Sequence, residues 1–573
     1  MAHNFSWFRT KEICLQFSLN RDKKIIRPLM KSFTSRLWKI SIILTALIFS
    51  IPILTILSSF IEPSGENWEH LKDSVLSEYI YNSLLLTSGV GVGALVLGVS
   101  TAWLTTMCKF PGKKLFVWLL LLPMAMPAYI VAYTYTGMFD YAGPVQTAIR
   151  SWTGWGLRDY YFPQIRSLGG AIAMLSLVLY PYVYLLARTA FLQQSVGVIE
   201  VSRSLNCSPW QSFYWVGLPL ARPAIAAGLS LALMETLADY GTVAYFGLKV
   251  FTTGIFRTWF GLGDYSAASR MAAMLLLFVF ILIIIERVSR NKSKFHNTSG
   301  KLAHYSEYSL KGFKAYGAFS TCAIPLFLGF FLPATQLLAW ALETWREMMD
   351  DRFFEIARNS IVLGFSAALI SVIVALFLGY GKRILPEKMM IISVRTASIG
   401  YALPGTVIAV GVIIPFAWFD KKIDSLMNSY FGFSSGLILS GTIFAVIFAY
   451  VVRFLAVSLQ TVESGLEKIK PSMDDAARSL GYRPREALMK VHIPLLKSSS
   501  LTALMIVFVD VMKELPATLI LRPFDFNTLA VRTFELASDE RLADSSTSAL
   551  AIVLAGLLPV IYLSQTISKT RLK

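Results

Sequence analysis

The chain has 573 residues, of which 55% are hydrophobic and 15% charged, and 53 Lys and Arg against 35 Asp and Glu give a formal charge of +18. Soluble domains are about 45–50% apolar and about 25% charged, so this composition argues against an ordinary globular enzyme. Uncharged apolar runs of about 20 residues, long enough to cross a bilayer as helices, recur along almost the whole chain.

The apolar runs predict twelve membrane spans. They lie at about 37–60, 79–105, 115–138, 168–190, 217–238, 271–286, 316–340, 358–380, 390–417, 436–458, 497–521 and 545–567. The first run is too long for a signal-peptide core and ends without a small-residue cleavage site, so we interpret it as a retained membrane helix. Prolines inside several runs do not oppose this reading, because neighbouring helices can satisfy the freed backbone groups.

The basic residues are unevenly distributed among the connections. Residues 1–36, 286–315 and 461–497 are basic, whereas 61–78 and 341–357 are acidic. Lys and Arg are retained on the cytoplasmic side of a membrane, so we expect both chain ends in the cytoplasm. The positive charge then reports orientation in a lipid bilayer, and we expect no nucleic-acid partner.

An internal repeat divides the chain. With an offset of 275, Arg203-Ser204-Leu205 recurs as Arg478-Ser479-Leu480, Pro209 as Pro484, Pro219-Leu220 as Pro494-Leu495, and Thr253 and Arg257 as Thr528 and Arg532; with an offset of 277, Asn82-Ser83 recurs as Asn359-Ser360 and Pro127 as Pro404. The repeat predicts an all-α integral membrane protein whose six-span halves are related by a pseudo-two-fold axis along the membrane normal. We expect a cytoplasmic tail at 1–36, halves at 37–286 and 316–568, and a cytoplasmic linker at 287–315.

A patterned cytoplasmic loop lies between the fourth and fifth spans of each half. In the second half it reads Asp475-Ala476-Ala477, three residues, Gly481, nine residues and Val491-His492-Ile493-Pro494; in the first it reads Glu200-Val201-Ser202, three residues, Asn206, nine residues and Val216-Gly217-Leu218-Pro219. Gly and Asn tolerate a left-handed backbone best. The pattern therefore predicts two short helices at an angle, forming a rigid knob. A single such loop would suit an amphipathic helix on the lipid headgroups, but its duplication favours the knob.

These loops resemble the signature loop of bacterial ABC importer membrane subunits, which runs E-A-A, three residues, G, nine residues, I-x-L-P. This chain departs from that pattern at Asp475, Val491 and Asn206. The resemblance implies the type I ABC importer permease fold and a knob that docks into a separate ATP-binding subunit. The residues implied in this contact are Glu200, Ser204, Asn206, Pro219, Asp475, Ala476, Ala477, Gly481 and Pro494.

Further motifs resemble the fused, double-length ferric-iron permeases. They are Leu122-Pro123-Met124-Ala125-Met126-Pro127-Ala128-Tyr129, Met234-Glu235-Thr236-Leu237-Ala238-Asp239-Tyr240-Gly241-Thr242, Tyr401-Ala402-Leu403-Pro404-Gly405, Met512-Lys513-Glu514-Leu515-Pro516-Ala517-Thr518 and Leu521-Arg522-Pro523-Phe524. The resemblance implies an inner-membrane permease that accepts ferric iron from an external solute-binding protein and is driven by two copies of an ATPase subunit. An ABC permease for thiamine, polyamine or phosphonate remains an alternative, as does a secondary transporter.

Two pairs of acidic residues lie deep in the fifth and eleventh runs. Glu235 and Asp239 are four residues apart, as are their repeat equivalents Asp510 and Glu514, so each pair shares one helical face. Carboxylates inside a membrane are costly and mark a pathway or a paired site, and carboxylate oxygens suit hard metal ions. These four acids are the candidate cargo path.

Each of these candidate roles has a structural alternative. The four acids could instead pair with Lys513, Arg522, Arg257 or Arg532 and hold the bent outer end of the span together. Tyr129, Tyr133 and Tyr135 could contact ferric iron, but Tyr is also common at membrane interfaces. The outer segments 140–167 and 341–357 are candidates for receiving a binding protein, with interface anchoring by their Trp residues as the alternative.

Catalytic patterns are missing from the sequence. No G-x-x-x-x-G-K-[ST] loop occurs, and the five His residues have no metal-ligand spacing. The four Cys residues are scattered, which argues against a disulfide framework or a zinc site. We expect no catalytic residues and no cofactor, so a partner must hydrolyse ATP.

Overall fold

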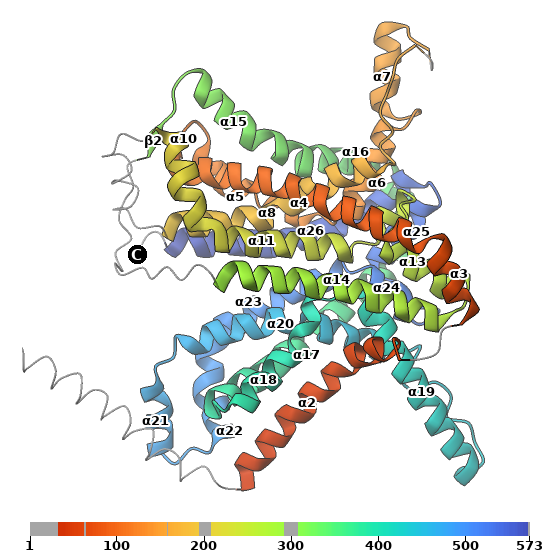
Figure 1. The fold of residues 1–573 in the computed structure, drawn as a ribbon, viewed down its shortest axis with the longest axis vertical. Helices are drawn as coiled ribbons and strands as arrows, with labels where there is room; N and C mark the ends of the chain where they lie inside the picture. The colour runs from red at the N-terminus through yellow and green to blue at the C-terminus, as the bar shows by residue number, and fades with distance from the viewer. Residues whose placement is uncertain (1–32, 62–64, 157–158, 194–207, 292–306, 571–573) are drawn as a thin grey trace, which may run out of the picture.

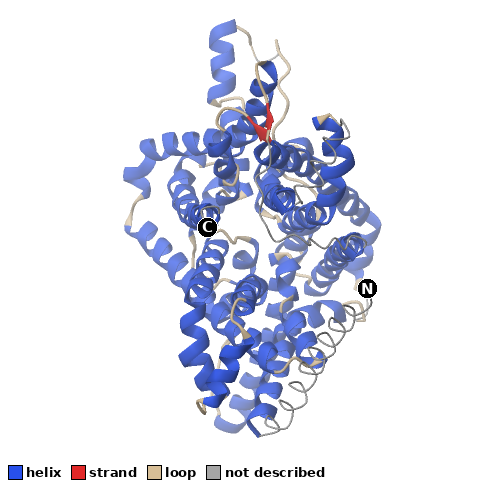
Figure 2. Cartoon of the chain, turned by 90° about the vertical axis from the view of Figure 1, so that its left-hand side faces the viewer, coloured by secondary structure: helices blue, strands red, loops and turns tan. Residues whose placement is uncertain are grey.

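The computed structural model describes residues 33–61, 65–156, 159–193, 208–291 and 307–570 (Figure 1). Its longer helices are α2 (Phe33–Ser58), α4 (Leu76–Met107), α8 (Leu168–Gln193), α11 (Leu218–Ala238), α14 (Tyr265–Asn291), α15 (Phe313–Leu326), α16 (Leu332–Met348), α17 (Asp351–Ile384), α19 (Gly405–Phe431), α20 (Ile443–Glu467), α23 (Ile493–Met512) and α26 (Leu542–Thr570). The shorter helices are α3 (Glu66–Ser74), α5 (Lys113–Leu119), α6 (Ala128–Phe139), α7 (Pro144–Thr153), α10 (Pro209–Ser212), α12 (Gly241–Tyr245), α13 (Phe251–Phe256), α18 (Lys388–Ala397), α21 (Pro471–Ser479), α22 (Pro484–Ala487), α24 (Pro516–Leu521) and α25 (Leu529–Ser538). In the part of the chain described, the only strands are β1 (Cys108–Lys109) and β2 (Tyr308–Ser309), which pair in parallel beside the Lys113–Glu307 ion pair of 2.9 Å (Figure 2).

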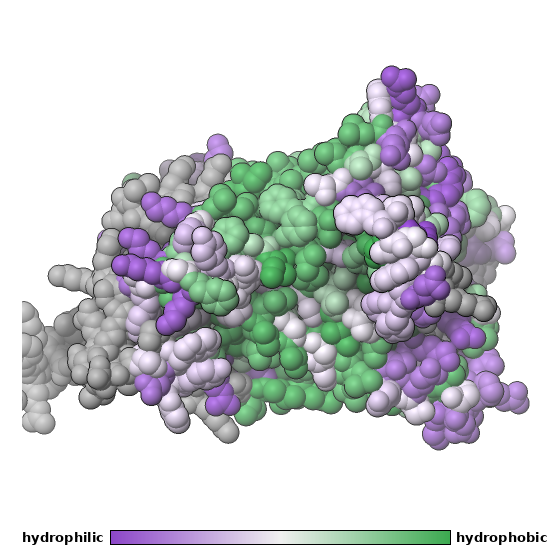
Figure 3. Space-filling view, turned by 90° about the horizontal axis from the view of Figure 1, so that it is seen from above, coloured by the Kyte–Doolittle hydropathy of each residue, from purple (hydrophilic) through white to green (hydrophobic). Residues whose placement is uncertain are grey.

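The long helices form a membrane bundle. Among the described residues, ten helices are long and apolar enough to span a membrane, or twelve if two bent helix pairs each count as one span. On the face seen in Figure 3, a broad apolar band lies between two more hydrophilic ends. One end, here the α3 face, carries α3 and α7; the opposite end, the α21 face, carries α10, α21 and α22 (Figure 1). The predicted all-α membrane fold is confirmed.

The third span of each half is broken at a proline. The first break lies between Ala125 and Ala128 and bends the chain by 89°; the second lies between Ala402 and Gly405 and bends it by 116°. Pro127 and Pro404 precede the helices that follow, α6 and α19, where a fixed φ and a missing donor are tolerated. The continuous spans predicted at 115–138 and 390–417 are therefore wrong in this detail, since each is two helices.

Three other predicted boundaries are wrong. The span predicted at 497–521 ends at Met512, and α24 is a separate helix after a break. The span predicted from 436 begins at Ile443, because residues 432–442 return beside α19 and donate hydrogen bonds to Asp420, including a 2.7 Å bond from the Ser440 amide. The segment 341–357 is not a loop, because α16 runs to Met348 and α17 begins at Asp351, which leaves a turn of only two residues. Asp350 caps α17 there by accepting from the Phe353 amide at 2.7 Å, as N-cap carboxylates do.

The repeat is visible in individual contacts, yet the halves also exchange helices. Ser83 accepts a hydrogen bond from the first amide of α13 at 3.2 Å, and its equivalent Ser360 accepts from the first amide of α25 at 2.8 Å. The first span, α2, packs against α18 and α19 of the second half, whereas α15 and α16 pack against α4 and α6 of the first half. The hydrophobic cores are consequently shared between halves, which ties the two halves together.

Most of the predicted tail 1–36 and much of the predicted linker 287–315 lie outside the described residues.

Candidate functional site

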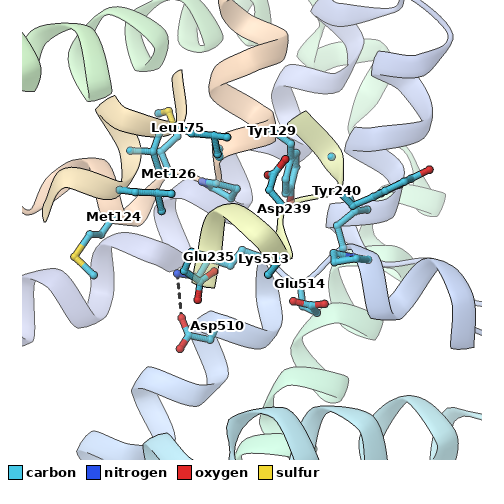
Figure 4. A pocket seen from close by; sticks show the side chains of 18 of the residues that line it. Met124, Met126, Tyr129, Leu175, Glu235, Asp239, Tyr240, Asp510, Lys513 and Glu514 are labelled. Atoms are coloured by element: carbon cyan, nitrogen blue, oxygen red, sulfur yellow. Dashed lines mark ion pairs between the residues drawn. The ribbon is translucent and has the colours of Figure 1, made fainter. Parts of the chain in front are cut away.

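A cavity of about 120 Å³ lies where the broken helices of the two halves meet (Figure 4). Its walls come from the first proline break, from the α11–α12 break and from the α23–α24 break. All four predicted acids line it, together with Arg453, Lys513 and the phenols of Tyr129, Tyr182, Tyr240 and Tyr401. The sequence repeat therefore places both acidic pairs around one space between the halves, at helix breaks typical of membrane transport sites.

One acid of each pair caps a short helix. Asp239 accepts hydrogen bonds from the Thr242 amide at 3.1 Å, the Thr242 hydroxyl at 3.0 Å and the Val243 amide at 3.1 Å, at the start of α12. Its repeat equivalent Glu514 accepts from the Ala517 amide at 3.1 Å, at the start of α24. A carboxylate there satisfies amides that have no partner within the helix. Asp239 and Glu514 thus hold the breaks in shape.

Glu514 also forms a buried ion pair with Arg453 of α20. The Arg453 guanidinium donates to Glu514 at 2.8 Å, and the two side chains are 9% and 5% exposed. Gly405, at the start of α19, lies so close that a Cβ there would collide with both charged groups. This pair joins α20, α19 and the α23–α24 break into one unit. Removing either residue would leave the other charge buried without a partner.

The other acid of each pair differs between the halves. Asp510 pairs with Lys513 at 3.0 Å (Figure 4), which is the structural alternative that the sequence left open. Among the described residues, the Glu235 carboxylate forms no hydrogen bond or ion pair, although it lines the same cavity as Arg453 and Lys513. At the repeat equivalents of Lys513 and Arg453, the first half has Ala238 and Val178. Glu235 is therefore the one acid of the four that is left unpaired.

The cavity is negatively charged without being a closed metal site. Four carboxylates and two cations line it, which leaves two carboxylates in excess. Within the described ranges, no three His, Cys, Asp or Glu side chains converge closely enough to hold a metal ion. A cation in the cavity would contact only a few of the carboxylate and phenol oxygens at once and would therefore be bound weakly. Weak binding at several positions is what passage through a membrane protein requires.

The second-half knob has the predicted short helix and turn, but the predicted second short helix is not separate from the span. Helix α21 ends before Gly481, whose φ of 78° is left-handed. Helix α22 then continues into α23, with Pro494 in the first turn of α23, so that Pro484–Met512 is one helix. Ala477 is buried, whereas Asp475 is 62% exposed and pairs only with Arg478 of its own helix at 3.5 Å. The apolar side chains of Met473, Leu480 and Met489 are exposed on the same knob. These side chains give the α21 face an exposed apolar patch beside the charged Asp475.

Arg383 fixes this knob to the membrane helices. From the end of α17 it donates to Asp474 of α21 at 2.7 and 3.0 Å and to the Ile469 carbonyl at 2.8 Å. It also donates to the Leu466 carbonyl at the end of α20. The Nε2 atom of the fully buried His492 lies 2.7 Å from the other Asp474 oxygen. These contacts join α21 directly to α17 and α20.

The first-half knob is only partly described. Glu200, Ser204 and Asn206 lie outside the described residues. Pro219 occupies the first turn of α11, as Pro494 does in α23. Trp210 and Trp215 are 69% and 80% exposed beside it, on the same face of the molecule as α21 (Figure 1).

Sequence reasoning missed Arg453 and Arg383. Arg453 is the lone charge in the apolar part of its run, and a cation inside a span marks a site or a pair, so this signal was present. The role of Arg383 had no such signal, because a basic residue at the end of a span also fits the ordinary orientation pattern.

Comparison with known proteins identifies the family. The Fe(3+)-transport system permease protein FbpB 2 of Haemophilus influenzae is 26% identical over 86% of this chain and 90% of its own length. The ferric transport system permease protein FbpB of Actinobacillus pleuropneumoniae is 24% identical over 77% of this chain and 64% of its own length. The sulfate transport system permease protein CysT of Escherichia coli is 24% identical over 92% of its own length but 45% of this chain, and so resembles one half.

The binding-protein-dependent transport system inner membrane component family matches this chain twice, at residues 94–293 and 371–573. With two copies of that domain, the chain is a multi-pass inner-membrane component of a binding-protein-dependent transport system and belongs to this family.

Proposed function

We propose that this chain is the permease of an ATP-driven importer that carries ferric iron into the cell. The observation that carries the proposal is the cavity between the halves, where carboxylates outnumber cations by four to two. Hard cations such as ferric iron prefer oxygen ligands. Relatives that align over most of this chain are named as ferric-iron permeases, which supports the same cargo here.

The sign of the cavity charge separates this cargo from an anion. An anion would meet two unbalanced carboxylates inside the helix bundle, where charge interactions are stronger than in bulk water. The sulfate relative matches only one half of the chain, whereas the ferric relative covers both. A cationic cargo therefore fits the charges of this cavity better than an anionic one.

The orientation follows from the charged ends. The α21 face receives the basic connections, such as 381–388, and the α3 face carries the acidic Glu66 and Glu69 of α3. By the positive-inside rule we assign the α21 face to the cytoplasm, and the basic residues near both chain ends support a cytoplasmic location for them as well. The external solute-binding protein then meets the α3 face, and the ATPases meet the α21 face.

Energy enters through the two knobs. Two copies of an ATP-binding subunit dock on the loops around 198–212 and 473–487, and their closure on ATP rocks the halves between inward and outward access. The contact residues we assign are those of the signature loops, namely Glu200, Ser204, Asn206, Pro219, Asp475, Ala476, Ala477, Gly481 and Pro494. The Arg383 contacts support this route, since they join α21 to α17 and α20. The free energy of ATP binding and hydrolysis in the partner is then coupled to the change in cargo access in this chain.

Radioactive ferric-iron uptake tests the proposal. Cells without other ferric importers would express this chain with its ATPase and binding protein, and each component would be omitted in turn. We expect uptake only with all three, and none with an ATPase that binds but does not hydrolyse ATP. Unlabelled thiamine, polyamine or phosphonate should not compete. Uptake that persists without the ATPase would indicate a secondary transporter, and the absence of iron uptake from the complete system would overturn the assignment of cargo.

A further inference from the structure

We propose that Tyr129, Tyr133 and Tyr245 line the route by which cargo reaches the cavity from the α3 face, and that the Arg166–Glu540 ion pair is the latch that closes this route. The direction of travel rests on the proposed function. The route and its latch rest on contacts in the structure alone.

The three phenols form a continuous column. Tyr129 lines the cavity near Asp239 (Figure 4). Its ring centre is 5.7 Å from that of Tyr133, one turn further along α6, and the Tyr133 ring is 4.6 Å from that of Tyr245 on α12. The Arg166 guanidinium lies 4.8 Å from the Tyr245 ring centre and donates to the Tyr245 hydroxyl at 3.2 Å. The column therefore runs without a gap from the cavity to the latch.

Two hydroxyls in this column have no partner. Tyr129 and Tyr133 are 5% and 2% exposed, and neither hydroxyl forms a hydrogen bond within the described part of the chain. Buried polar groups are nearly always paired, and exceptions require an explanation. Phenol and carboxylate oxygens together suit a hard cation. Unpaired oxygens that lead to an acidic cavity are accounted for if a passing ligand, or water around it, contacts them in turn.

The latch joins the two halves at the α3 face. Arg166 precedes α8, whereas Glu540 lies between α25 and α26 of the second half. Both terminal nitrogens of Arg166 donate hydrogen bonds to the Glu540 carboxylate, at 2.9 and 2.8 Å. The Arg166 guanidinium also lies 3.8 Å from the Asp140 carboxylate. The Arg166 hydrogen bonds hold the pKa of the Glu540 carboxyl below its ordinary value. Both side chains are partly exposed, at 35% and 59%, so water can replace this contact when the halves separate.

The backbone at Glu540 supports a specific role for this pair. Its φ is 61°, and Glu540 is the only described residue other than glycine in the left-handed region. Such conformations are unfavourable for side-chain-bearing residues and persist where surrounding contacts impose them. Here the conformation aims the carboxylate across the boundary between the halves, at Arg166.

The column belongs to one half only. At the repeat equivalents of Tyr129, Tyr133 and Tyr245, the second half has Thr406, Val410 and Ile520. An equivalent column of phenols is therefore not encoded there. The column reaches the cavity through Tyr129 of the first half, the half that contributes Glu235 and no cation to the cavity lining.

The first experiment is ferric-iron uptake by Tyr133→Phe, with Tyr180→Phe as the matched control. Tyr180 is likewise fully buried with an unpaired hydroxyl, but it lies on α8 outside the column. We expect Tyr133→Phe to reduce uptake about tenfold, the effect of losing one ligand hydrogen bond, and Tyr180→Phe to retain it. Neither change should lower the apparent melting temperature, because no partner is lost. Full uptake by Tyr133→Phe would overturn the route.

The second experiment does not depend on the cargo. In a variant without native cysteines, Tyr133→Cys would be treated from the α3 side with a membrane-impermeant maleimide, using right-side-out vesicles. We expect labelling to increase at least about tenfold when Glu540→Gln or Arg166→Gln is added. Trp152→Cys on α7, where Trp152 is 91% exposed, should be labelled equally in all backgrounds. Unchanged labelling at position 133 overturns the latch, whereas latch-dependent labelling without iron uptake supports the route and refutes only the ferric-iron assignment.

Discussion

The two halves share a backbone plan but differ in the charges that surround the cavity. Each half contributes two carboxylates four residues apart, and in each the later one, Asp239 or Glu514, caps a short helix. Only the second half adds cations, with Lys513 beside Asp510 and Arg453 beside Glu514. The repeat thus sets the positions of the four acids. Lys513 and Arg453, which have no charged equivalents in the first half, determine that Glu235 is the acid without an ion-pair partner.

The comparison assigns different tasks to the halves. The first half supplies the unpaired Glu235 and the column of phenols. The second half supplies the ion pairs that hold helices α19, α20 and α23 together around Gly405. Substitutions that remove the difference between equivalent positions test this division.

The largest effect is expected from Arg453→Met. Loss of the guanidinium leaves Glu514 charged and buried without its partner, which costs about 3–5 kcal/mol. We expect a large fall in the apparent melting temperature of the purified protein in detergent. The double variant Arg453→Met with Glu514→Gln should recover much of that stability, because the amide oxygen can still accept from the Ala517 amide. Equal stability of the single and double variants would show that the ion pair is not what holds this break.

Gly405→Ala should have the next largest effect. The added Cβ would collide with the Arg453 and Glu514 side chains, and overpacking of this kind costs about 1–3 kcal/mol. The first half offers a matched control, because the repeat equivalent of Gly405 is Ala128 at the start of α6. We expect Ala128→Gly to change the melting temperature by less, within about 1 kcal/mol. Similar losses in both variants would mean that the backbone, and not the ion pair, requires glycine at position 405.

Glu235→Gln should separate transport from stability. The change removes the unpaired carboxylate while breaking no contact, so we expect unchanged or higher thermal stability and about tenfold lower iron uptake. Asp510→Asn removes the same charge but leaves Lys513 without its partner, so it should lower both stability and uptake. Wild-type uptake by Glu235→Gln would show that the acids only shape the cavity.

Sequence reasoning succeeded where the signal was local or repeated. The apolar runs and the left-handed Gly481 depend on residues near one another in the chain, and the structure has both. The duplication of the loop stays a prediction, because most of its first copy lies outside the described residues. The exchange of first spans between halves was not predictable in this way, since it depends on packing across the bundle. The Arg453–Glu514 pair joins residues 61 positions apart, whereas the Asp510–Lys513 pair, at three positions, was among the foreseen alternatives.

The smallest effect is expected at the knob, where the halves again differ. The second half has Gly481 with a φ of 78°, and the first has Asn206 at the equivalent position of the sequence. Asn accepts the left-handed region better than other side chains do, so Gly481→Asn should weaken co-purification of the ATPase only slightly, by about threefold or less. Gly481→Val places a β-branched residue in the same conformation, which costs more than about 1 kcal/mol, and should reduce co-purification well below that of Gly481→Asn.

The protein itself should remain folded, because Gly481 has open space around it. Equal co-purification with Asn and Val would show that the left-handed turn does not shape the docking surface, and that the exposed Leu480 and Met473 beside it suffice.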